Sequence, residues 1–137
     1  MDKAGFKYTG EKFLIYWDPE EKILFEEFWG EHHIKDAEDY QNKFSELAAK
    51  IPGNDPINIL ADVSKQKKTD HEARRIYTKI SSHPRSGNSA ICGANLVVGM
   101  IANFIGIATR RKNIKCFSTR DEGLSWLREI KGKITKG

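Results

Sequence analysis

The sequence predicts an α/β fold in which an N-terminal antiparallel hairpin leads into a βαβαβα unit, with about five strands in a mostly parallel sheet and four helices. Short apolar runs at residues 57–61, 89–93 and 114–117 have the length of buried strands, and segments with helical apolar spacing separate them. Strands that alternate with helices pair in parallel through right-handed crossovers. No linker divides the 137 residues, so we expect a single domain.

The N-terminal part is predicted to contain the hairpin and one helix. Residues 12–17 are β-branched and aromatic, and residues 23–29 alternate apolar with acidic side chains, as strands do. An acidic pair then begins a helix over residues 36–51, where apolar side chains recur at helical spacing. A Pro-Gly-Asn-Asp-Pro run ends this helix before the next strand.

The stretch from residue 57 to residue 77 is the predicted working region. Residues 57–61 form a buried strand, a basic loop follows, and a helix opens at Thr69 and Asp70. Open α/β sheets bind ligands and partners at the carboxyl ends of their strands. We therefore expect a partner-binding surface made of polar residues from this edge, namely Asp62, Ser64, Thr69, Asp70 and His71, flanked by His33, Asn95 and Thr119.

The C-terminal part is predicted to contain two helices around a short strand. Asn95 precedes a strongly apolar helix that ends near Arg111, and residues 114–117 form the strand. Ser118 or Thr119, with an acidic residue three positions later, makes a capping box for the last helix.

Charge is distributed unevenly along the chain. Residues 1–60 carry a net charge of −6 and residues 61–137 a net charge of +10, which favours steered protein association. The basic clusters 65–68 and 110–112 are predicted at opposite edges of the sheet. They cannot form one continuous basic footprint, so we expect no nucleic-acid binding.

The ordering of elements and three local motifs resemble the STAS-like family, in particular the small SpoIIAA-like (STAS/SEC14-type) proteins related to anti-sigma factor antagonists. The motifs are Leu-Ala-Asp-Val-Ser at residues 60–64, the apolar helix at 95–109, and the closing strand and helix at 114–127 with an acidic pair, a small residue and Trp-Leu. The likeness covers roughly residues 10–131. It implies a βα-superhelical sheet and a non-enzymatic regulatory module that binds a partner kinase or regulator.

The resemblance also implies a phosphorylation switch, and the sequence departs from it. Typical members carry Asp-Ser-Ser-Gly at the start of the helix after the central strand, whereas this chain has Thr-Asp-His-Glu at residues 69–72. Thr69 is the nearest hydroxyl and the only candidate phosphosite, but an N-cap function is favoured for it.

The residues do not favour catalysis, a metal site or a cofactor. Ser64, His71 and Asp62 could be imagined as a hydrolase triad, yet no nucleophile elbow or oxyanion-forming glycine run accompanies them. The four histidines lack metal-ligand spacing, and no phosphate-binding glycine loop is present. Cys92 and Cys116 lie in apolar runs and are expected to be reduced core residues in a cytoplasmic protein without a signal peptide.

The apolar segment 89–109 is long enough to suggest a membrane span, but Gly-Ala-Asn at residues 93–95 divides it into a strand and a buried helix. We therefore expect no transmembrane segment. One face of that helix carries only small residues, which are Gly99, Ala102, Asn103 and Gly106. This face could pack closely on a neighbouring element, form a homodimer interface, or line a pocket. A carrier or sensor of a small hydrophobic, lipid-like ligand is therefore the alternative to a partner-binding module.

Overall fold

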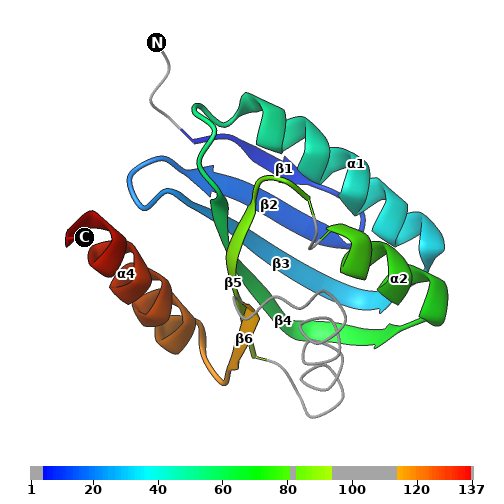
Figure 1. Ribbon diagram of the computed structural model, residues 1–137. Coiled ribbons are helices and arrows are strands. Elements are labelled where there is room, and N and C mark those ends of the chain that lie inside the picture. The colour runs from blue at the N-terminus through cyan, green and yellow to red at the C-terminus, as the bar shows by residue number, and fades with distance from the viewer. Residues whose placement is uncertain (1–4, 81–82, 94–113, 137) are drawn as a thin grey trace.

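The structure contains a six-stranded sheet and three helices within the residues that it describes (Figure 1). It is a computed structural model, and it describes residues 5–80, 83–93 and 114–136. In chain order the elements are β1 (Lys7–Thr9), β2 (Phe13–Asp18), β3 (Ile23–His32), α1 (Ile34–Lys50), β4 (Ile57–Thr69), α2 (His71–Ile80), β5 (Ser86–Cys92), β6 (Ile114–Phe117) and α4 (Arg120–Lys136).

The strands form one mixed sheet in the order β1-β2-β3-β4-β5-β6. β1, β2 and β3 are antiparallel neighbours, whereas β3, β4, β5 and β6 are parallel. The predicted hairpin followed by a parallel sheet is thus confirmed. Because the parallel strands run in one direction, their carboxyl ends gather at one edge of the sheet.

Helices cover both faces of the sheet. α1 and α2 pack on one face and on each other, and α4 packs across β4, β5 and β6 on the other face (Figure 1). β3 supplies side chains to both layers, with Leu24 and Phe28 toward α1 and Ile23 and Phe25 toward the side that α4 covers. Burial on both faces explains why its start is a continuous apolar run.

α4 approaches the sheet closely at Gly123. A Cβ atom built on Gly123 would lie 2.4 Å from the Cys92 sulfur and 3.2 Å from the Ala90 Cβ atom. The small residue in the C-terminal motif is therefore a packing requirement. Leu127, one turn later, is 1% exposed and fills the core against β4 and β5.

The number of strands differs from the prediction because β1 was not foreseen. All three of its residues, Lys7 to Thr9, are exposed, so it lacks the apolar alternation that marks a strand, and β2 alone holds it. The structure therefore has six strands where about five were expected. The predicted apolar helix from Asn95 to Arg111 lies outside the described residues.

Two strands are longer than their apolar runs. β5 begins at Ser86, three residues before the predicted Ser89. Its polar start is held by β4, since the Asn58 side-chain oxygen accepts the Asn88 N–H at 3.0 Å. β4 extends to Thr69, through the region predicted as a basic loop. Pairing with β3 keeps this polar segment extended.

Arg85 fastens the end of α1 to the start of β4. Its guanidinium donates to the carbonyls of Ala48 at 2.6 Å, Ile51 at 2.9 Å and Asp55 at 3.0 Å. The first two are C-terminal carbonyls of the α1 segment, which have no partner within a helix. The Arg85 carbonyl in turn accepts the Ile57 N–H at 2.7 Å.

Both cysteines are free; Cys92 is buried in the core as expected, whereas Cys116 is only partly buried. Burial raises the pKa of Cys92 to about 11, so this thiol stays protonated and unreactive near neutral pH. In the described part of the chain, no helix has the length and apolarity needed to cross a bilayer.

Candidate functional site at the carboxyl edge of the parallel strands

The predicted surface residues are spread along β4 rather than gathered in one loop. Ser64 and Thr69 both lie in this strand, so about 16 Å separates them at the usual rise per residue. His71 follows at the start of α2 and is farther still. The structure therefore divides the predicted surface into two polar clusters, one at each end of this segment.

The first cluster joins the starts of α1 and α2. The Asp70 carboxylate accepts the Ala73 N–H at 2.9 Å, so Asp70 is the N-cap of α2. Its other oxygen lies 3.0 Å from Nδ1 of His33. The Ala73 N–H, and then His33, hold the pKa of Asp70 below its usual range. His71 and Glu31 add exposed polar groups nearby in the chain.

A buried histidine, His32, links the two elements beside this cluster. His32 is 0% exposed, and its Nε2 donates to the Trp29 carbonyl at 3.2 Å, so its Nδ1 accepts the Tyr77 hydroxyl at 2.6 Å. Burial lowers the pKa of His32, which keeps the ring neutral and fixes these donor and acceptor functions. Since Tyr77 belongs to α2, the contact anchors α2 to the end of β3.

Asp36 fixes the start of α1. Its carboxylate accepts the His33 N–H at 2.9 Å and a hydrogen bond from Lys12 at 3.1 Å. Burial opposes ionisation of Asp36, yet the hydrogen bonds from His33 and Lys12 leave its pKa below the usual value. The cation and the carboxylate are partly buried, so the pair fixes the residue before β2 against α1.

The second cluster lies where β3 and β4 meet α4. Arg120, the first residue of α4, donates to Glu27 at 3.1 Å, and its guanidinium lies 3.8 Å from Asp62. Glu27 and Asp62 are register partners on neighbouring strands, so without Arg120 two carboxylates would face each other. Asp62 also accepts the Ser64 hydroxyl at 2.7 Å and the Ser64 N–H at 2.9 Å.

Thr119 belongs to the second cluster only as a helix cap. Its hydroxyl accepts the Glu122 N–H at 3.2 Å, which is one of the two hydrogen bonds of the predicted capping box. The Glu122 carboxylate accepts the Thr119 hydroxyl at 3.0 Å. Thr69, in contrast, is not the cap of α2. It ends β4, accepts a hydrogen bond from Gln66 at 2.8 Å, and leaves the cap position to Asp70.

The arrangement offers no hydrolase triad in the described residues. Ser64 donates its proton to Asp62 instead of to a histidine, and the length of β4 separates it from His71. No group of three or more ligand side chains in the described ranges could hold a metal ion. Asn95 and the small-residue face of Gly99, Ala102, Asn103 and Gly106 lie outside the described residues.

A buried polar pair at Glu26 and Tyr40 was missed. Glu26 is 2% exposed, burial raises its pKa to about 8, and the Tyr40 hydroxyl donates to its carboxyl group. A signal was present in the sequence, because Glu26 stands between Leu24 and Phe28 on the inward-facing side of a period-two strand. An acid at that position is expected to be buried and hydrogen-bonded.

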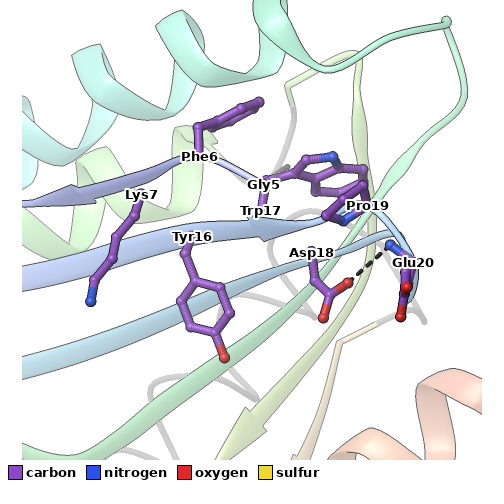
Figure 2. A pocket seen from close by; sticks show the side chains of 8 residues that line it. All are labelled: Gly5, Phe6, Lys7, Tyr16, Trp17, Asp18, Pro19 and Glu20. Atoms are coloured by element: carbon purple, nitrogen blue, oxygen red, sulfur yellow. Dashed lines mark hydrogen bonds between the residues drawn. The ribbon is translucent and has the colours of Figure 1, made fainter. Parts of the chain in front are cut away.

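A hollow of about 460 Å³ lies far along the sheet from both clusters. Its lining residues come from the segment before β1, the start of β1, the end of β2 and the turn after β2, namely Gly5, Phe6, Lys7, Tyr16, Trp17, Asp18, Pro19 and Glu20. Figure 2 shows Phe6 and Trp17 on one side of the strands and Lys7 and Tyr16 on the other. The hollow therefore follows the sheet edge and does not form an enclosed apolar cavity.

A family model described as "Domain of unknown function (DUF7793)" matches residues 18–131. Among solved structures, the chain is similar to an uncharacterised DUF3478-family protein with a SpoIIAA-like fold from Shewanella loihica PV-4. The two are 17% identical, with a TM-score of 0.61, over 90% of this chain and 92% of the other. The chain is also similar to SiaC of Pseudomonas aeruginosa, at 8% identity and a TM-score of 0.53, over 85% and 98% of the two chains.

No curated protein matches the sequence. At the low identities of the two solved structures, the likeness establishes the fold alone. The SpoIIAA-like fold that the three sequence motifs suggested is thereby confirmed.

Proposed function

This chain belongs to the family described as a domain of unknown function (DUF7793), and from its SpoIIAA-like fold we propose that it is a non-enzymatic regulatory module that binds a partner protein. The binding surface is the carboxyl edge of the parallel strands. It comprises the cluster of His33, Asp70 and His71, the exposed part of β4, and the neighbourhood of Asp62, Ser64 and Thr119.

One observation carries this proposal. The carboxyl edge is exposed and rich in polar side chains, but those side chains bond to each other and to helix ends instead of forming a reactive pair. In the described ranges, no nucleophile lies within hydrogen-bonding distance of His71, which an enzyme using it as a base would require. A rigid polar edge of this kind suits recognition of a partner.

A photo-crosslinking residue tests the location of the surface. It replaces exposed His71 in one variant and exposed Asn54, in the loop before β4 at the opposite edge, in the control. The full chain is expressed in its native cell and irradiated. We expect a discrete crosslinked protein from position 71 and none from position 54. The same adduct from both positions, or adducts from position 54 alone, would contradict the proposed surface.

A carrier of a small hydrophobic ligand remains the alternative. It requires a closed apolar cavity, and its expected wall at residues 96–109 lies outside the described part. The hollow along β1 and β2 does not support it, because Lys7, Asp18 and Glu20 contribute to its lining. Native mass spectrometry of the purified chain separates the two functions. Lipid that copurifies at one molecule per chain would favour the carrier.

A further inference from the structure

Within the residues that the structure describes, β4 has a free edge over its last residues. β5 pairs with β4 only as far as Cys92, which lies opposite Asp62. β3 continues on the other side, where Trp29 pairs with Lys65 and His32 with Thr69. In the ranges that the structure describes, Lys65–Thr69 therefore has a strand neighbour on one side only. Figure 1 shows β4 continuing beside β3 past the end of β5 toward α2.

A free strand edge exposes backbone N–H and C=O groups that can pair with another extended chain. Two features make this edge selective. Lys65, Lys67 and Lys68 are all exposed. The register with β3 also shifts at two points, so β4 holds an extra residue at each and the edge is irregular. Lysines and bulges commonly protect an edge from aggregation. The same lysines also favour a segment of opposite charge.

The surroundings of the free edge are also basic. α2 contributes exposed Arg74, Arg75 and Lys79. The nearest acids in the sequence are already engaged, since Asp70 caps α2 and bonds His33, and Asp62 bonds Ser64 beside Arg120. Three acids lie close to these cations: Glu72 at 4.0 Å from Arg75, Asp70 beside Arg74, and Glu31 on β3 next to this part of β4. The six cations of β4 and α2 outnumber them, so the potential along this part of the molecule stays positive.

Building on the partner binding proposed above, we propose that the free edge of β4 at Lys65–Thr69 receives an acidic, extended segment of a partner protein as an added strand. Backbone hydrogen bonds would hold the segment, and its carboxylates would lie beside the three lysines. The charges would speed encounter and reject neutral or basic strands.

Peptide binding to the full chain tests the strand addition. The probe is a short peptide of alternating glutamate and valine. A second peptide has its central valines replaced by proline, which keeps the charge but removes the N–H groups that strand pairing needs. A third peptide has lysine in place of glutamate. We expect only the first to bind by calorimetry, with amide chemical-shift changes in Lys65–Thr69.

Charge-reversal variants test the lysines. The triple variant K65E/K67E/K68E is expected to weaken binding of the first peptide by about tenfold or more. The matched control, K22E/K35E/K50E, makes the same change in net charge at three other exposed lysines and should bind as the wild type does. Urea unfolding of both variants shows whether either loses the fold. If K65E/K67E/K68E does not fold, binding of the three peptides to the wild-type chain tests the strand addition instead.

Two results would contradict the strand addition. Equal binding of the proline peptide would show simple charge attraction and overturn the strand addition. No binding of the first peptide, or shift changes away from Lys65–Thr69, would mean that lysines and bulges only protect the edge, and would also overturn it. Neither result affects the crosslinking test at position 71, so the proposed function can stand if the free edge fails.

Discussion

The two halves of β4 differ in nearly every physical property although they form one continuous strand. Residues 58–62 have strand neighbours on both edges, residues 57–63 have packed helices or apolar layers on both faces, and Ile57 and Leu60 are each 1% exposed. Residues 64–69 have one strand neighbour in the described ranges and are mostly exposed and basic. The first half therefore supports the fold, which leaves the second half free to carry binding residues at little cost in stability.

Replacing a core side chain in the first half should have the largest effect. We expect Leu60→Ala to lower the free energy of unfolding by about 3 kcal/mol, because it leaves a cavity against Phe25 and Leu127. The matched change in the second half, Lys67→Ala, should stay within about 0.5 kcal/mol. Urea unfolding at neutral pH measures both. A similar loss from Lys67→Ala would show that the second half is also structural.

Removing the Arg85 hydrogen bonds near the start of β4 should have the second-largest effect on stability. Arg85→Ala leaves the carbonyls of Ala48, Ile51 and Asp55 without their charged donor, so we expect a loss of about 2 kcal/mol. Arg74→Ala on exposed α2 is the control, and it should leave the thermal unfolding temperature nearly unchanged. Equal unfolding temperatures for the two variants would mean that the three carbonyls are as well satisfied by water as by Arg85, so that the Arg85 hydrogen bonds do not stabilise the fold.

A pH series tests the buried acid beside the first half of β4, since Glu26 pairs with Ala61. Burial raises the pKa of Glu26 from 4.5 to about 8, although the Tyr40 hydroxyl opposes the shift. Between these values the folded chain keeps a proton that the unfolded chain has lost. Its stability should therefore fall as pH rises, by up to about 1.4 kcal/mol per pH unit, and level off above the folded pKa.

Glu26→Gln should lack that slope, because its side chain is neutral at every pH. Urea unfolding of both proteins from pH 5 to pH 8 gives the comparison. Groups that both chains share, such as His32, cancel in the difference between them. Parallel stability curves would show that Glu26 is not protonated in the folded chain.

The sequence allowed prediction of those parts of the fold where the local sequence pattern and the tertiary contacts favour the same secondary structure. The apolar run at residues 57–61 is a strand because hydrophobic burial alone requires it, and the hydroxyl–acid spacing of Thr119 and Glu122 specifies a cap. The SpoIIAA-like fold was expected from the resemblance of the element order and three motifs to a known family, and it is confirmed. Local rules were sufficient in these places because no distant contact opposed them.

The missed features depend on contacts between distant residues. Lys65–Thr69 has the composition of a loop, and only β3, more than thirty residues earlier, makes it a strand. β1 has no apolar pattern and exists through pairing with β2. Thr69 and Asp70 are both residue types that favour the N-cap position of a helix. Asp70 is the N-cap of α2, because its carboxylate lies within hydrogen-bonding distance of the Ala73 N–H. The predicted surface is divided into two clusters because β4 is longer than expected and holds Asp62 and Asp70 far apart.

In the described residues, the free edge begins beyond Asp62, because β5 ends at Cys92. Gly93 follows with a φ of +75°, and a Cβ atom there would lie 2.8 Å from the Ser64 Cβ atom, so glycine suits this position. The turn into α2 at Asp70 closes the other end. Between them, Lys65–Thr69 spans about 13 Å, enough for a matching segment of about five residues. The distance between these two ends thus sets the length of extended segment that can pair with β4.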